Sequence, residues 1–145
     1  MVANSASNEQ IFEFALELAG IPPDRFNSMD IFGGNFIDGD DAFNFMEEYS
    51  KKFGVNLDSY RWYFHHGEEG FNIGAIFFKP PYARVKSIPM TMEMLISSAT
   101  EGRWMLKYPD HTLPDKRTDL SINLACTVVC VLLLIAAGLA KFSAQ

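Results

Sequence analysis

The chain has 145 residues, a formal net charge of −6 and two cysteines. Residues 1–50 contain ten of the 18 acids but only one of the 12 bases, so their formal net charge is −9. The remaining residues, with 8 acids and 11 bases, have a formal net charge of +3. The length suits one domain, and two cysteines build neither a disulfide framework nor a thiolate zinc site. The acidic part would be repelled by nucleic-acid phosphates, so we expect no nucleic-acid partner; it suits a basic protein partner or a solvated face.

The first predicted helix covers residues 8–19. Ser7 and Gln10 have the spacing of a capping box, and Gly20 followed by two prolines provides a stop. Its predicted apolar stripe consists of Ile11, Phe12, Ala15, Leu16, Leu18 and Ala19. Residues 21–37 then form a long connection, and we expect a packed loop because of its apolar residues, which are Ile21, Phe26, Met29, Ile31, Phe32 and Phe36.

The second predicted helix covers residues 40–53, with Asp38 as its N-cap and Gly54 as its stop. Asp40 and Asp41 suit the positive end of its macrodipole. Its predicted buried face recurs at steps of three and four residues and consists of Ala42, Phe45, Met46, Tyr49 and Phe53.

The stretch after this helix is less regular. One helical turn is predicted near residues 59–64. His65–His66 with Glu68–Glu69 is the only metal-like cluster, but adjacent histidines on a turn point apart, so we predict no metal site. Residues 71–86 are aromatic and β-branched and predict a short strand or hairpin, although Gly74 and two prolines interrupt them.

The C-terminal part predicts one more helix of the domain and then a membrane segment. Thr91 and Gly102 bound a helix at residues 92–101, and residues 107–120 form a polar juxtamembrane linker. Residues 121–140 contain no charge, and a helix of twenty residues spans the roughly 30 Å hydrocarbon core of a bilayer. The alternative, a buried core helix, is less favoured because few domains of this size bury a helix that is apolar on every face.

The charges that flank this segment predict its orientation. Four bases precede it and only Lys141 follows it; the four are Arg103, Lys107, Lys116 and Arg117. Because the basic side of a membrane helix stays in the cytoplasm, we expect a single-pass protein of the inner (cytoplasmic) membrane whose N-terminal domain is cytoplasmic. Residues 141–145 would then form an external tail. The pair Cys126 and Cys130 shares one helix face without suggesting a role.

We find no catalytic motif of the hydrolase, metalloprotease or phosphate-loop kind. Asp38, Asp40 and Asp41 depart from the calcium-loop pattern, because Ala42 and Phe43 stand at its fifth and sixth places. We therefore expect no enzyme activity, no catalytic residue, no cofactor and no bound metal.

The order of these elements resembles an acyl carrier protein: an acidic helix, a long packed loop, a hydrophobic–Asp–small-residue turn, an acidic helix, a short helix and a final helix. In that family the turn carries a serine that holds the phosphopantetheine arm. Here the turn reads Ile37-Asp38-Gly39-Asp40, so Gly39 stands in the place of that serine. Glycine has no hydroxyl and cannot carry the arm.

A closer resemblance is to a bacterial family of short acyl-carrier-like proteins of unknown function, DUF1493. It rests on IDGDDAFNFMEEYSKKFGVNL and IPMTMEMLISSATEGRW and covers about residues 8–106. The resemblance implies a mainly all-α fold, with a small acyl-carrier-like helical bundle in residues 1–106. To this fold the sequence adds the short hairpin predicted near residues 71–86 and the transmembrane helix. The resemblance also implies a partner-binding face on the second helix, made of Asp38, Asp40, Asp41, Glu47 and Glu48.

Two functions fit these observations. The first is a non-enzymatic, membrane-tethered interaction module that docks a basic protein partner. The second is a small acidic immunity or inhibitor protein that acts on a toxin or enzyme at the membrane. An active carrier that uses another serine is disfavoured, because Ser28, Ser50 and Ser59 do not follow the aspartate at the head of the helix.

Overall fold

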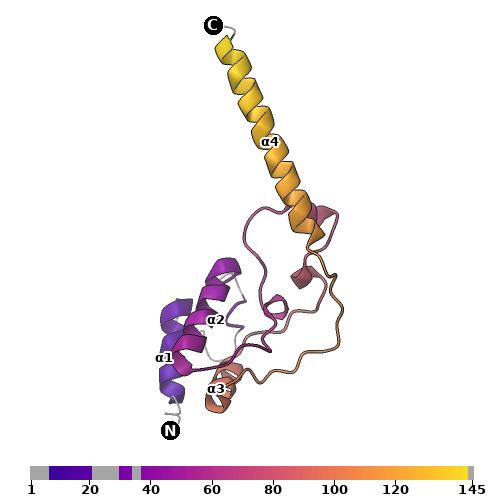
Figure 1. Ribbon diagram of the computed structural model, residues 1–145. Coiled ribbons are helices and arrows are strands. Elements are labelled where there is room, and N and C mark those ends of the chain that lie inside the picture. Colours follow the sequence, from indigo (N-terminus) through magenta and orange to yellow (C-terminus); the bar gives the residue numbers. More distant parts are fainter. Residues whose placement is uncertain (1–6, 21–29, 34–36, 144–145) are drawn as a thin grey trace. The chain divides into compact units, whose positions relative to one another are not determined.

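The computed structural model describes residues 7–20, 30–33 and 37–143 (Figure 1). The chain divides into two compact units. Unit 1 comprises residues 1–69 and 85–111, and unit 2 comprises residues 70–84 and 112–145. Residues 70–84 therefore belong with the C-terminal helix, whereas the sequence had placed them in the N-terminal domain.

Unit 1 contains three α-helices at the predicted places: α1 (Asn8–Ala19), α2 (Gly39–Phe53) and α3 (Met92–Glu101). The mainly helical fold class is thereby confirmed. The capping box of Ser7 and Gln10 is present, and the Thr91 side chain accepts a hydrogen bond from the Met94 N–H. Each helix ends at a glycine of positive φ, as its sequence predicted. The short 3₁₀ turn η2 (Trp62–Phe64) confirms the turn expected near residues 59–64.

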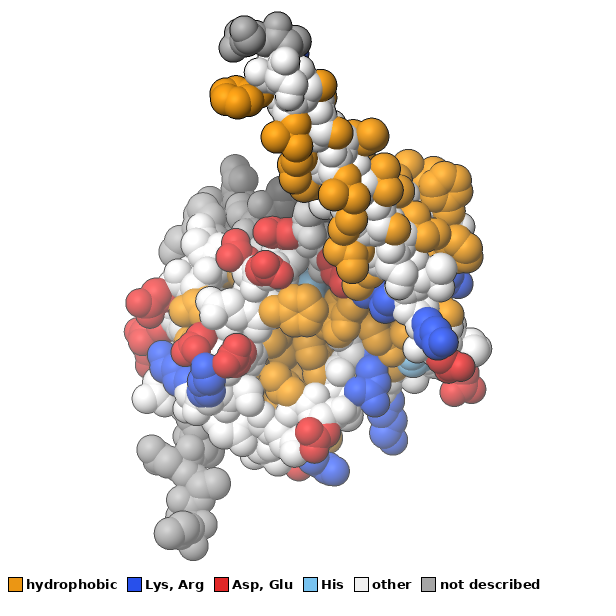
Figure 2. Space-filling model, turned by 45° about the horizontal axis from the view of Figure 1, so that its top comes forward, with side chains coloured by type: hydrophobic (Ala, Val, Ile, Leu, Met, Phe, Trp, Pro, Cys, Tyr) orange, Lys and Arg blue, Asp and Glu red, His pale blue; other side chains and the backbone are white. Residues whose placement is uncertain are grey.

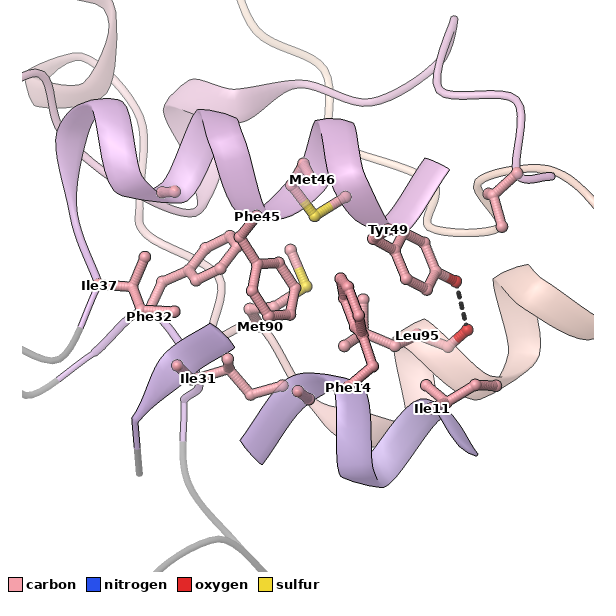
Figure 3. Packing of buried hydrophobic residues seen from close by; sticks show 14 of the residues in the cluster. Ile11, Phe14, Ile31, Phe32, Ile37, Phe45, Met46, Tyr49, Met90 and Leu95 are labelled. Atoms are coloured by element: carbon pink, nitrogen blue, oxygen red, sulfur yellow. Dashed lines mark hydrogen bonds between the residues drawn. The ribbon is translucent and has the colours of Figure 1, made fainter. Parts of the chain in front are cut away.

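The core of unit 1 lies where these helices meet, and aromatic rings fill much of it (Figure 3). Phe14 of α1 lies 5.3 Å from the ring centroids of both Phe45 and Phe53 of α2. The predicted face of α2 is confirmed, with Phe53 partly buried and the other four residues buried. The predicted stripe of α1 is wrong at Leu18, which is exposed, and omitted the buried Phe14, which lies one turn after Ile11 on the same face.

Hydrogen bonds tie the connections of unit 1 to this core. The Tyr49 hydroxyl donates to the Leu95 carbonyl at 2.5 Å, which joins α2 to α3 (Figure 3). The Ile31 N–H donates to the Met90 carbonyl at 2.8 Å. Ile31 and Phe32 are buried, as expected for a packed loop. The other apolar residues of that predicted loop lie outside the described residues; they are Ile21, Phe26, Met29 and Phe36.

Unit 2 corrects the hairpin predicted at residues 71–86. Its residues 70–84 form two 3₁₀ turns, η3 (Ile73–Ile76) and η4 (Pro81–Ala83), and the described part of the chain contains no β-strand. Two local causes favour turns. The Asn72 side chain accepts from the Ala75 N–H and so caps η3, and Pro80 and Pro81 have no N–H to donate to a strand partner.

The long helix of unit 2 is α4 (Thr118–Ser143), which begins three residues before the predicted apolar segment and ends three residues after it. It is long and apolar enough to cross a membrane, and none of its apolar window is buried within the protein. Hydrophobic side chains are accordingly distributed along its visible surface (Figure 2). η3 packs against α4, and Gly74 lies so close to it that a Cβ would be 1.8 Å from the Asp119 carbonyl oxygen.

Candidate partner-binding site at the head of α2

The acids of the candidate site are all exposed on α2 or at its N-cap. Asp40 and Glu47 are seven residues apart, as are Asp41 and Glu48, so the four side chains form two rows along one outward face. The four acids of the helix therefore share one solvent-facing surface. Their role in binding is taken up below.

The charges of this face are not equally available. Lys51 Nζ lies 2.7 Å from Glu47 Oε1 and 3.1 Å from Glu48 Oε1. The hydrogen bond from Lys51 lowers the pKa of Glu47, and these two glutamates raise the pKa of Lys51. Asp40 and Asp41 form no ion pair with any base in the described part of the chain. The uncompensated negative charge therefore lies at the head of α2.

Asp38 occupies the N-cap position of α2, but its side chain does not cap the helix. Its Oδ1 instead accepts a hydrogen bond from the Gly67 N–H at 2.7 Å. The two residues are 29 positions apart in sequence, so the contact fixes residues 65–69 to the head of α2. Asp38 thus holds a loop, and one of its two carboxylate oxygens is already engaged.

Gly39, which the resemblance to acyl carrier proteins aligned with their serine, is buried under this loop. Its φ is +52°, which L side chains rarely adopt. A Cβ at this position would lie 2.0 Å from Cγ and 2.8 Å from the backbone nitrogen of Glu69. The position therefore lacks more than a hydroxyl: the loop leaves no space for any side chain.

An aromatic patch, made of Phe43, Trp62 and His66, borders the acids. Phe43 is 40% exposed, and its ring centroid lies 4.7 Å from that of His66 and 5.4 Å from that of Trp62. Sequence reasoning missed this patch. One signal was available, because Phe43 lies three residues after Asp40 and four before Glu47 and so belongs to the outward face.

His66 is the unusual member of the patch. Its Nδ1 lies 2.8 Å from the Gly67 carbonyl, so Nδ1 carries the proton, and its buried Nε2 has no hydrogen-bond partner among the described groups. Burial lowers the pKa of His66, although the Gly67 carbonyl and Asp38 oppose the shift. The ring is therefore held neutral, with an unshared lone pair enclosed by aromatic neighbours.

His65 has a different, structural role. The Tyr108 hydroxyl accepts from the Arg61 N–H at 3.1 Å and from Trp104 Nε1 at 2.9 Å, which leaves its own proton for His65 Nε2 at 2.8 Å. His65 Nδ1 then donates to the Ile88 carbonyl at 2.9 Å. Burial lowers the pKa of His65 to about 4. The two adjacent histidines thus point to different partners, and the described residues contain no group of three His, Cys, Asp or Glu that could hold a metal ion.

The comparisons with known proteins bear on the family. The family model of DUF1493, a protein of unknown function, matches residues 27–107, which is more than half of the chain. The match contains α2, the loop over Gly39 and α3, whereas α1 and α4 lie outside it. Searches of curated proteins and of solved structures gave no match. The chain therefore belongs to the DUF1493 family of proteins of unknown function.

Proposed function

We propose that the protein is a non-enzymatic, membrane-tethered interaction module, similar to an acyl carrier protein in the order of its helices but without a phosphopantetheine arm. It docks a basic protein partner through the head of α2. One observation carries the proposal: Gly39 is buried beneath Glu69, while Asp40 and Asp41 beside it are exposed and unpaired with any described base. Glu69 covers the position at which a carrier protein would hold its arm, whereas the acidic side chains beside that position are exposed to solvent.

The aromatic patch supports docking at this place. Energetically important residues at interfaces are often aromatic side chains surrounded by polar groups. Phe43 is exposed between Asp40 and Glu47 and is backed by the rings of Trp62 and His66. A partner that covers Phe43 would bring its bases against the two unpaired aspartates, which favours fast and salt-sensitive association.

Affinity capture of the full-length protein from membranes tests the docking face. We expect Asp40→Lys with Asp41→Lys to abolish recovery of the partner, since it replaces attraction by repulsion. The matched control is Glu9→Lys with Glu13→Lys on α1, which changes the net charge equally at exposed sites elsewhere. An unchanged partner list in the α2 variant would contradict the proposal. Recovery of a toxin whose activity is blocked would favour an immunity or inhibitor protein instead.

A second experiment tests the absence of an arm. The full-length protein in detergent is incubated with a phosphopantetheinyl transferase and coenzyme A, and its intact mass is measured. We expect no change in mass, because Gly39 offers no hydroxyl and no other serine follows Asp38. A gain of one phosphopantetheine would refute the non-carrier part of the proposal.

The membrane tether is supported by α4, whose uncharged stretch of twenty residues contains no buried residue. The excess of bases before it supports a cytoplasmic N-terminal unit. Orientation is measured with single cysteines in a Cys126→Ala, Cys130→Ala background and a membrane-impermeant maleimide added to spheroplasts. We expect labelling of Ser143→Cys but not of Ser97→Cys, an exposed site on α3, until the membrane is permeabilised. The reverse pattern would contradict the orientation.

A further inference from the structure

Residues 70–84 are attached to the first turns of α4. Asn72 Nδ2 donates to Asp119 Oδ2 at 3.0 Å, and the Ile73 N–H donates to Asn123 Oδ1 at 3.0 Å. The backbone of Gly74 lies against the Asp119 carbonyl with no room for a side chain. The position of this segment is therefore set by the position of the N-terminal end of α4.

The segment turns its large apolar side chains outward. Phe71 is 82% exposed, Ile76 76% and Phe77 69%, and Phe78 is exposed as well. We call these four residues the apolar foot. Four such side chains within eight residues form a surface of the kind that marks an interaction site, and the exposed apolar surface of α4 belongs to the same unit.

Bases gather next to the apolar foot. Lys79, Arg84, Lys116 and Arg117 line a small hollow beside Phe78. The Arg84 Nε donates to the Lys79 carbonyl at 2.6 Å, which closes the turn that carries both bases. Arg117 pairs with the buried Asp119 at 2.6 Å. Lys79 and Lys116 have no carboxylate partner in the described part of the chain, so their charge is available to an anion.

We propose that the apolar foot inserts among the headgroups of the membrane that α4 crosses, and that Lys79 and Lys116 bind the phosphate groups of anionic phospholipids. This inference rests on the proposed membrane tether. Asp119, to which the segment is attached, precedes the uncharged stretch by two residues, or about 3 Å of helix. The foot is therefore placed at the depth of the headgroups, where aromatic side chains and cations are favoured over other residues.

The composition of the surface favours lipid over a protein occupant. Residues 70–84 contain two bases and no acid. Residues 112–123 contain two acids, and one of these, Asp119, is buried against Arg117. Long basic side chains can keep their charge at the phosphates while their stems accompany Phe77 into the acyl boundary. An apolar surface with a basic border thus complements a layer of anionic headgroups above hydrocarbon.

The experiment uses the full-length protein in nanodiscs, with one cysteine labelled by an environment-sensitive fluorophore in the Cys126→Ala, Cys130→Ala background. The label is placed at Phe77→Cys in the foot, at Leu132→Cys in α4 or at Ser97→Cys in unit 1. Quenching is measured with lipids brominated near the headgroup or deep in the acyl chain. Nanodiscs contain either phosphatidylcholine alone or phosphatidylcholine with phosphatidylglycerol.

We expect the label at 77 to be quenched several-fold more than the label at 97, and more by shallow than by deep bromine. The label at 132 should be quenched most by deep bromine. If the label at 132 is not quenched, α4 does not cross the bilayer and the proposed tether fails. If 132 is quenched while 77 behaves like 97, the tether stands and the foot is refuted.

The role of the two lysines has its own test. Lys79→Glu with Lys116→Glu should leave quenching at 132 unchanged and should remove the increase at 77 that phosphatidylglycerol produces. Lys51→Glu with Lys52→Glu on α2 is the matched control and should retain that increase. An unchanged response to phosphatidylglycerol in the Lys79/Lys116 variant would refute headgroup binding by these lysines.

Discussion

The two units of this protein differ in where their large aromatic and aliphatic side chains lie. Unit 1 buries Phe14, Phe45 and Tyr49. Unit 2 exposes Phe71, Ile76 and Phe77, and hydrogen bonds of Asn72, Asp119 and Asn123 join its segments. Water drives apolar side chains together, whereas hydrocarbon does not and instead makes an unpaired polar group costly. The proposed membrane tether accounts for this difference, and each prediction below tests one side of it.

The largest effect is expected from truncation of a core ring. Phe45→Ala in the full-length protein in micelles should lower the free energy of unfolding of unit 1 by about 3–5 kcal/mol, because it leaves a cavity among packed aromatic rings. Phe77→Ala removes the same side chain from an exposed site of unit 2 and should cost less than about 0.5 kcal/mol. For both variants, denaturant unfolding followed by tryptophan fluorescence measures the free energy of unfolding of unit 1, since Trp62 and Trp104 lie there. Equal costs would contradict the comparison.

The next effect is a pH dependence of the stability of unit 1 between pH 6.5 and 4. His65 has a pKa of 6.5 unfolded but about 4 when folded, so the unfolded chain binds more protons between these values. Stability should be full above pH 6.5 and fall by about 3 kcal/mol as the pH drops towards 4. His65→Gln should flatten this slope, leaving the part due to His66, whose pKa burial also lowers. A slope that persists unchanged in the variant would show that His65 is not its source.

A smaller effect is expected at Gly39, beneath the loop that contains Glu69. Gly39→Ala must adopt a positive φ and displace Glu69, so we expect a loss of about 2 kcal/mol or more of the free energy of unfolding. Gly54→Ala, with φ +67° and nothing within 4 Å of its Cβ, should cost only about 1 kcal/mol. The same denaturant titration measures both. If Gly39→Ala were the milder change, the loop would not close the site.

The smallest effect concerns the polar contacts of unit 2. Asn123→Ala removes the acceptor of the Ile73 N–H and should cost about 1 kcal/mol locally. Amide hydrogen exchange at Ile73 in micelles should become several-fold faster. Thr127→Ala, one turn further along α4, removes a hydroxyl that donates to the Asn123 carbonyl and leaves the acceptor of the Ile73 N–H in place, so it serves as the control. Equal exchange in both variants would mean that the segment is held on α4 by other contacts.

Local rules were sufficient for most of the fold. Capping residues and glycine stops predicted all three helices of unit 1, because these signals act within one turn of the chain. The hairpin prediction failed at residues 71–86, because exposed aromatic side chains give the same composition as a strand whose one face is buried. The cap that Asn72 provides and the contact of Gly74 with Asp119, 45 positions apart, distinguish the two.

The candidate site, too, could be predicted from the sequence only in part. The acids of α2 and their spacing could be read from the sequence, and so could the pairing of Lys51 with Glu47, which are four residues apart. The bond from Gly67 to Asp38 and the closure over Gly39 could not, because they depend on how a distant loop returns to the helix. Sequence therefore identified which charges are present, and the structure shows which of them are already engaged.

The Tyr108 hydroxyl has a practical consequence for dissecting the protein. It joins the backbone of Arg61 with the rings of His65 and Trp104. A soluble fragment that stops at residue 106, soon after the last helix of unit 1, would leave the buried rings of His65 and Trp104 without this partner. A fragment without α4 should therefore end after His111. This end point also retains the hydrogen bond between the His111 ring and the Tyr63 hydroxyl at 2.7 Å.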